Sequence, residues 1–180
     1  MARWKFDPSH SGTEFVVRHM MVSKVRGTIS GIDGWLEFDE ANPAASQIEA
    51  HVDVRTINTQ QVERDAHLRS ADFFDAENYP TLTFKSSKVE VTTDNTGKVH
   101  GDLTIRGVTR PVTLDVEYFG TIKSLFGDTR AGFSGNITIN REDFGLTWNQ
   151  MLETGGVLVG KDVSIHIELQ AVLETVSEPA

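Results

Sequence analysis

The sequence predicts an all-β protein in which about eight antiparallel strands close into a barrel with one short helix. Three observations lead to this fold class: long stretches alternate between apolar and polar residues, turn-forming residues separate them, and only one segment has a helical period. The clearest stretch is 161–174, whose apolar positions are Val163, Ile165, Ile167, Leu169, Ala171 and Leu173. A period of two is typical of a strand with one buried and one hydrated face.

The remaining strands follow the same rule along the chain. Further alternating stretches cover 15–21, 48–55, 98–106, 112–118 and 131–139. Turn-forming residues lie between the stretches, at 33–34, 42–43, 95–97, 107, 127–128 and 155–156. A closed sheet of about eight such strands is wide enough either to be filled by side chains or to hold one small ligand.

One segment, about 62–74, departs from the alternation and predicts a short helix packed on the barrel. It follows Asn58 and Thr59, either of which can cap a helix. The expected apolar face begins at Val62 and also carries Arg69, which has an aspartate at pairing distance on each side. Arg69 therefore has two interpretations, an ion pair within the helix or a role at an opening of the barrel.

Composition limits the partners. The chain has 180 residues, of which 38% are hydrophobic, and this suits one domain with a real core. We expect that domain over 1–175 and a frayed tail over 176–180. The formal net charge of -9 argues against a nucleic-acid partner, because a phosphate backbone needs a basic face.

Cysteine is absent, so disulfides and cysteine-bound metals are excluded. The six histidines stand at least nine residues apart, so no compact histidine metal motif is present, and no cofactor is expected. The first residues lack the apolar run of a signal peptide, and no stretch approaches the length of a transmembrane helix. These features predict a cytoplasmic protein without a transmembrane segment.

Two polar residues occupy inward positions of otherwise apolar faces. His19 follows Phe15 and Val17 in phase, and Arg141 ends the inward phase of 133–141. A core histidine is commonly satisfied by a hydrogen bond, and an arginine at a strand end often pairs with a nearby acid. Together, in an apolar cavity, the two residues would also anchor an anionic or carbonyl head group.

The segment 144–159 has more apolar bulk than a surface loop needs, without clean alternation. It is either a plug that closes one end of the barrel or an adaptable lip. In the second case Met20, Met21 and Met151 would serve as compliant lining for a long hydrocarbon.

Several motifs resemble those of the YceI-like family of bacterial proteins. They are Trp4-Lys-Phe-Asp-Pro-Ser-His-Ser, Phe15-Val-Val-Arg-His-Met, Val25-Arg-Gly, Arg64-Asp-Ala-His-Leu-Arg-Ser-Ala-Asp-Phe-Phe, Tyr79-Pro, Thr83-Phe84, Gly101-Asp-Leu-Thr-Ile-Arg-Gly-Val-Thr-Arg-Pro-Val and Arg141-Glu-Asp-Phe-Gly. The resemblance implies an eight-stranded, lipocalin-like barrel with a helix, often dimeric, whose lumen holds a polyisoprenoid such as a prenyl phosphate or a quinone tail. Many members carry a periplasmic signal peptide, which this sequence lacks, so a periplasmic role is not carried over.

The leading hypothesis is a protein that binds a polyisoprenoid and sequesters or transports it, with transient membrane contact and a homodimeric state. The head-group candidates are His19 and Arg141, with His67 and Arg69 behind them. The residues expected to line the tail are Phe15, Val17, Met21, Ile29, Leu36, Phe38, Val52, Val54, Phe84, Leu103, Ile105, Leu114, Val116, Phe133, Ile137, Phe144, Trp148 and Leu169. On this hypothesis, replacing Arg141 with alanine weakens a prenyl phosphate more than the matching alcohol.

Two alternatives belong to other functional classes. An enzyme would use dispersed polar residues, chiefly Asp65, His67, Arg69, His10 and His19. No nucleophile-elbow, dinucleotide or phosphate-loop pattern supports a reaction, and no catalytic residue is assigned. A packed scaffold would bind no lipid and would pair with itself or a partner through its surface.

Overall fold

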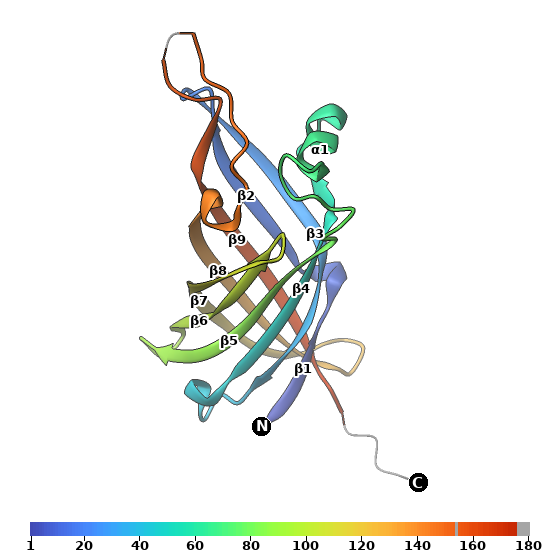
Figure 1. The fold of residues 1–180 in the computed structure, drawn as a ribbon. Coiled ribbons are helices and arrows are strands. Elements are labelled where there is room, and N and C mark those ends of the chain that lie inside the picture. The colour runs from blue at the N-terminus through green and yellow to red at the C-terminus, as the bar shows by residue number, and fades with distance from the viewer. Residues whose placement is uncertain (154, 176–180) are drawn as a thin grey trace.

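A computed structural model describes residues 1–153 and 155–175, and within them it has nine antiparallel strands (Figure 1). The strands are β1 (Ala2–Phe6), β2 (Gly12–His19), β3 (Ser23–Phe38), β4 (Gln47–Asn58), β5 (Thr81–Val91), β6 (Thr96–Ile105), β7 (Val108–Lys123), β8 (Thr129–Asn140) and β9 (Val159–Leu173). The tail expected at 176–180 lies outside the described residues.

The sheet closes into a barrel with eight strand positions. Its order is β1-β3-β2-β9-β8-β7-β6-β5-β4, and β4 pairs back to β3. β1 and β2 share one position, because both pair with β3 and β9 at different heights: Trp4 lies opposite Leu36 and Leu173, and Val17 lies opposite Val25 and Val163. The short 3-10 helix η1 (Pro8–His10) separates them. The predicted eight-stranded antiparallel barrel is therefore confirmed.

The two ends of the barrel differ. One end carries the helix α1 (Val62–Arg69) and the short 3-10 helix η3 (Arg141–Phe144), whereas the amino terminus and η2 (Pro43–Ala45) lie at the other (Figure 1). The longest strands, β3 and β7, have 16 residues each. At about 3.3 Å per residue such a strand spans about 50 Å, so the barrel is elongated.

The helix begins at Val62 as predicted but ends at Arg69, and turns follow it. The expected caps are not used, because Gln61 is the capping residue and makes no side-chain cap bond. The buried carboxylate of Asp65 instead accepts hydrogen bonds from the backbone N–H of Thr59 (2.8 Å) and from its hydroxyl (2.5 Å). This carboxylate ties the helix back to the end of β4.

The predicted apolar face of the helix was also wrong at Val62, which is exposed. Phe73 from the following turns packs on the core together with Leu68 from the helix. Within the described residues, Arg69 forms no ion pair with either aspartate, since Asp72 pairs with His67 at 2.9 Å. Among residues 1–153 and 155–175, no helix has the length and hydropathy needed to cross a membrane.

An ion-pair network joins the β1–β2 corner to the β7–β8 hairpin. Arg130 donates to the carboxylates of Asp7 (2.7 Å) and Asp128 (3.0 Å), and all three side chains are largely buried. Hydrogen bonds with Ser9, His10 and Arg130 hold the pKa of the Asp7 carboxyl well below its usual range. The network therefore stabilises the fold while Asp7 is ionised.

We expect Asp7→Asn to lower the free energy of unfolding by about 1–3 kcal/mol at pH 7, because charge-assisted hydrogen bonds are weakened. A carboxyl with a depressed folded pKa contributes stability above its unfolded pKa of about 4, and the contribution is lost as the pH falls. The difference between wild type and variant should therefore shrink from pH 7 to pH 3 in urea unfolding. Asp162→Asn, at an exposed position of β9, is the control. A difference that is the same at both pH values would contradict this role of Asp7.

Candidate ligand-binding cavity

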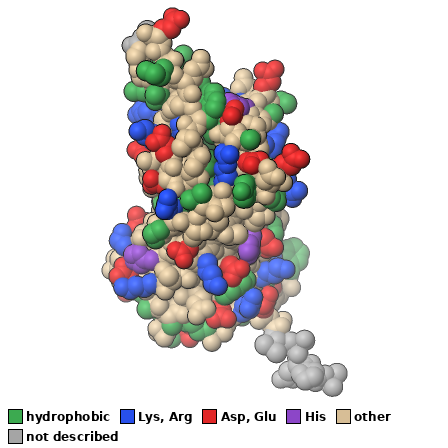
Figure 2. Space-filling model, in the orientation of Figure 1, with side chains coloured by type: hydrophobic (Ala, Val, Ile, Leu, Met, Phe, Trp, Pro, Cys, Tyr) green, Lys and Arg blue, Asp and Glu red, His purple; other side chains and the backbone are tan. Residues whose placement is uncertain are grey.

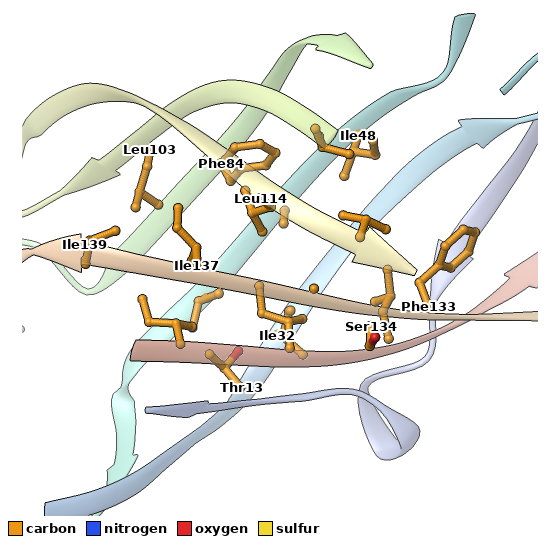
Figure 3. A pocket seen from close by; sticks show the side chains of 18 of the residues that line it. Thr13, Ile32, Ile48, Phe84, Leu103, Leu114, Phe133, Ser134, Ile137 and Ile139 are labelled. Carbon is orange, nitrogen blue, oxygen red and sulfur yellow. The ribbon is translucent and has the colours of Figure 1, made fainter. Parts of the chain in front are cut away.

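The barrel encloses an elongated cavity of about 540 Å³. Side chains from facing strands point into it, among them Ile32 on β3 and Leu114 on β7 (Figure 3). Its walls are almost entirely aliphatic and aromatic, as expected when the inward phase of every strand is apolar. The volume lies in the range of small-molecule sites.

The cavity has a closed and an open end. At the closed end, called the inner end here, the lining residues Phe73, Arg141, Phe144 and Leu146 are all buried. The open end, called the mouth, is formed by Glu40, Pro43, Ser46 and residues 93–97, and Glu40 and residues 93–95 are exposed. A ligand can therefore enter at the mouth.

The structure places fifteen of the eighteen predicted tail residues in the lining. They are Phe15, Val17, Ile29, Leu36, Phe38, Val52, Phe84, Leu103, Ile105, Leu114, Val116, Phe133, Ile137, Phe144 and Leu169. All but Phe144, which ends η3, belong to strands, where the alternation of side chains fixes the face on which a residue lies.

The other three tail residues lie outside the lining. Met21 is exposed, because β2 ends at His19 and the chain turns through Met20 and Met21, both with a positive φ. Val54 is buried within the wall without lining the cavity. Trp148 packs edge-on against the His67 ring, with 4.6 Å between centroids, outside the inner end.

Of the four head-group candidates, only Arg141 belongs to the lining. His19 is half-buried at the last position of β2, opposite Ser23 and Val159. His67 pairs with Asp72, its ring packs edge-on against Phe73 at the inner end, and Arg69 ends the helix. His19 and His67 thus lie beside Val159 and Trp148, whose carbonyl oxygens Arg141 binds, without a hydrogen bond to Arg141 itself.

Arg141 is buried and holds the segment that closes the inner end. Its guanidinium donates to four backbone carbonyl oxygens, those of Leu146 (2.6 Å), Gly160 (2.8 Å), Trp148 (3.0 Å) and Val159 (3.2 Å). Burial lowers the pKa of Arg141 from its ordinary value, and the neighbouring Glu142 opposes that change. Four of its five N–H groups are thus used within the protein.

The segment 144–159 takes the first predicted form, the plug, whereas the predicted methionine lip is wrong, because Met20, Met21 and Met151 are exposed and outside the cavity lining. Phe144 and Leu146 are buried against the core and form the plug. Beyond them, the Asn149 side chain donates to the Val159 carbonyl oxygen (2.8 Å), and Met151 is exposed. The chain before β9 projects from this end of the barrel (Figure 1).

The mouth contains polar residues that the sequence did not single out. The Tyr118 hydroxyl donates to the Glu40 carboxylate, and burial together with this bond raises the pKa of Tyr118 to about 12. Ser46 has a buried hydroxyl without a hydrogen-bond partner among the described residues, as does Thr13 deeper in the lumen. Tyr118 continues the inward phase of 112–118, but Glu40 and Ser46 come from a connection, where no periodicity reveals the direction of a side chain.

Three aromatic rings meet across the lumen near the mouth. Phe38 from β3 contacts Tyr118 from β7 and Phe133 from β8, with centroid distances of 5.0 and 5.4 Å. β3 lies across the barrel from β7 and β8 in the strand order, so these contacts span the lumen. A long ligand must pass or displace this cluster.

The histidines do not assemble a catalytic or metal site. His10 contacts Asp7 and Ser9 through the same ring nitrogen, Nδ1, so it cannot relay a proton between them. His51, His100 and His166 each contact a glutamate on the outer face. Within 1–153 and 155–175, no three potential metal-binding side chains lie close enough to hold an ion.

Outside the barrel, acidic and basic side chains are interspersed on the face shown in Figure 2, without a continuous basic patch.

The sequence matches the YceI-like domain family over residues 4–171. A curated relative, UPF0312 protein SA2479 of Staphylococcus aureus (strain N315), is 42% identical over 167 residues, which cover 92% of this chain and 95% of that protein. The family resemblance seen in the motifs is thereby confirmed.

Two solved structures have the same barrel. BcnA of Burkholderia cenocepacia has a TM-score of 0.80 at 25% identity, and the match covers 92% of this chain and 98% of that chain. A polyisoprenoid binding domain from Saccharophagus degradans, implicated in plant cell wall breakdown, has a TM-score of 0.67 at 15% identity, with coverage of 97% and 100%. The second similarity is one of fold.

Proposed function

The chain belongs to the YceI-like domain family, and from this membership and the cavity we propose that it binds a polyisoprenoid lipid inside the barrel. The observation that carries the proposal is the cavity itself, which is elongated, almost wholly apolar and open at a polar mouth. The Saccharophagus degradans domain with the same fold, described as polyisoprenoid binding, supports this ligand class.

The energetics suit a long hydrocarbon. Each five-carbon isoprene unit buried from water contributes roughly 3–4 kcal/mol gross, at about 0.8 kcal/mol per carbon group. Ordering of the chain and loss of translational freedom offset part of this sum. Dissociation from a dry lumen is slow, so a carrier needs a membrane or a partner to release the lipid.

We place the head group at the mouth, with the tail directed inward. A long chain enters through the open end, where Ser46 offers an unpaired hydroxyl and Tyr118 and Glu40 offer further polar groups. Glu40 and Asp94 are carboxylates, and no described lining residue at this end is a lysine or arginine. The mouth therefore favours a neutral head group, such as an alcohol or a quinone, over a phosphate.

Glu40→Gln tests this arrangement. We expect it to strengthen binding of a prenyl phosphate relative to the matching prenol by about twofold to fivefold, because one exposed like charge is removed. Glutamine keeps an acceptor for Tyr118, so the mouth stays intact. The control is Glu117→Gln, which makes the same charge change at an exposed position of β7 outside the lining. An unchanged ratio in the Glu40 variant would place the head group elsewhere.

The alternatives have less support. A packed scaffold does not explain the open cavity, and an enzyme lacks an assembled site among the described residues. We propose sequestration or transfer of the lipid, without a reaction. Transport, a cytoplasmic location and a homodimer stay predictions; light scattering tests the last of them.

A further inference from the structure

The tip of the β7–β8 hairpin exposes two large apolar side chains. Leu125 is 103% exposed and Phe126 is 91% exposed. Ile122 and Phe119, on the preceding strand, are also exposed and continue the apolar surface toward the barrel. We call Leu125 and Phe126 the apolar tip. Their exposure costs solubility without contributing to the core, so it calls for a partner.

The tip is held in shape by its own hydrogen bonds. Ser124 donates its backbone N–H to the Asp128 carbonyl oxygen (2.8 Å), and its hydroxyl accepts the N–H of Phe126 (3.1 Å). Gly127 takes the left-handed conformation that the turn requires. Arg130 pairs with both Asp128 and Asp7, and so joins the hairpin to the β1–β2 corner. The two apolar side chains are thus presented outward by an ordered turn.

The tip lies at the mouth end of the cavity. Figure 1 shows the hairpin at the same end as η2 and the amino terminus, away from α1. Hydrogen bonds also connect the mouth to the strand that leads to the tip. Glu40 of the mouth accepts them from Tyr118 and Thr121 of β7, and Thr121 lies four residues before Leu125. A surface that receives the tip is therefore brought next to the opening.

From this placement we infer that the apolar tip inserts into a lipid bilayer and docks the mouth of the cavity on the membrane surface. An aromatic and an aliphatic side chain on a rigid turn are suited to shallow, reversible insertion. A mouth held at the membrane lets an apolar tail pass without crossing water. Transfer of a lipid tail at the membrane rests on the proposed function, whereas docking of the protein on the membrane does not.

The charge of the protein selects the kind of membrane. A formal net charge of -9 gives no attraction to anionic lipids. Docking is then driven by apolar burial, so it should occur on phosphatidylcholine vesicles and be insensitive to salt. The opposite end also exposes apolar residues, Val22 and Met151, but there the cavity is closed by buried residues.

The test is co-flotation of the full chain with phosphatidylcholine vesicles at low and high salt. We expect Leu125→Ser/Phe126→Ser to reduce vesicle partitioning by at least about tenfold. The matched control, Val22→Ser/Met151→Ser, removes two equally exposed apolar residues from the other end and should partition like wild type.

Several outcomes overturn the inference: wild type that does not float, a tip variant that floats equally well, or an equal loss in the control. Light scattering compares the oligomeric states of the wild type and the tip variant. A difference between them would also overturn the inference, because it would assign the tip to contact with a second copy of the chain. Gly135→Phe, which fills the lumen, separates the two proposals: it should float normally while failing to bind a polyprenol. If wild type floats but binds no polyprenol, the docking stands and the proposed function fails.

Discussion

Gly135→Phe is expected to abolish binding of a polyprenol, with a loss of affinity of at least about a hundredfold. Gly135 lies on the inward face of β8, where a Cβ atom would be 3.5 Å from Leu114 and 3.9 Å from Ile167, at ordinary contact distances. Both neighbours line the cavity. A Cβ atom at this position fits without displacing the wall, so a phenyl ring directed into the lumen is expected to occupy the space that the tail needs.

The matched control is Gly132→Phe on the same strand. A Cβ atom there would lie 3.7 Å from the exposed Phe119, so the ring points to the outer face. This variant should bind the polyprenol with nearly wild-type affinity in vesicle-free solution. Circular dichroism and thermal unfolding verify that both variants are folded. Unchanged binding by a folded Gly135→Phe protein would contradict occupation of the lumen.

Arg141→Met is expected to lower the free energy of unfolding by about 3–5 kcal/mol, because the carbonyl oxygens of Leu146, Trp148 and Gly160 lose the charged donor, and Val159 keeps only the bond from Asn149. The methionine replaces the volume of the side chain but offers no N–H group. The carbonyls belong to the segment around Leu146 and to the start of β9, so the inner end should loosen first. The melting temperature should fall by about 10 °C.

Arg110→Ala is the control, because this exposed arginine donates one bond, to the Asp143 carbonyl oxygen of η3 (3.0 Å). It should cost less than about 1 kcal/mol. Binding then separates two roles of Arg141. The sequence hypothesis of a head-group contact predicts a greater loss for a prenyl phosphate than for the prenol, whereas a purely structural role predicts equal losses. A stability change as small as in the control would contradict the structural role.

The barrel and most of its lining could be predicted from the sequence because strand geometry is local. Once a residue such as Leu103 or Ile137 is placed in an alternating stretch, its face follows without knowledge of the rest of the fold. The same rule failed at Met21, where a turn ended the alternation, and at Trp148, in a segment without periodicity.

The parts that the sequence missed depend on contacts between distant residues. The helix start is held by Asp65 reaching back to Thr59, which no capping pattern describes. The mouth joins Glu40 to Tyr118, 78 positions apart in the chain. Arg141 lines the cavity, but its four carbonyl partners depend on the fold of the plug and on the start of β9, which no local pattern describes.

Native mass spectrometry of the intact protein, followed by extraction and identification of any bound lipid, tests the central claim most directly. We predict excess mass on the wild-type protein that corresponds to one lipid with repeating isoprene units, absent from Gly135→Phe. A wild-type protein that carries no lipid, and takes up neither added prenols, quinones nor prenyl phosphates, would contradict the account.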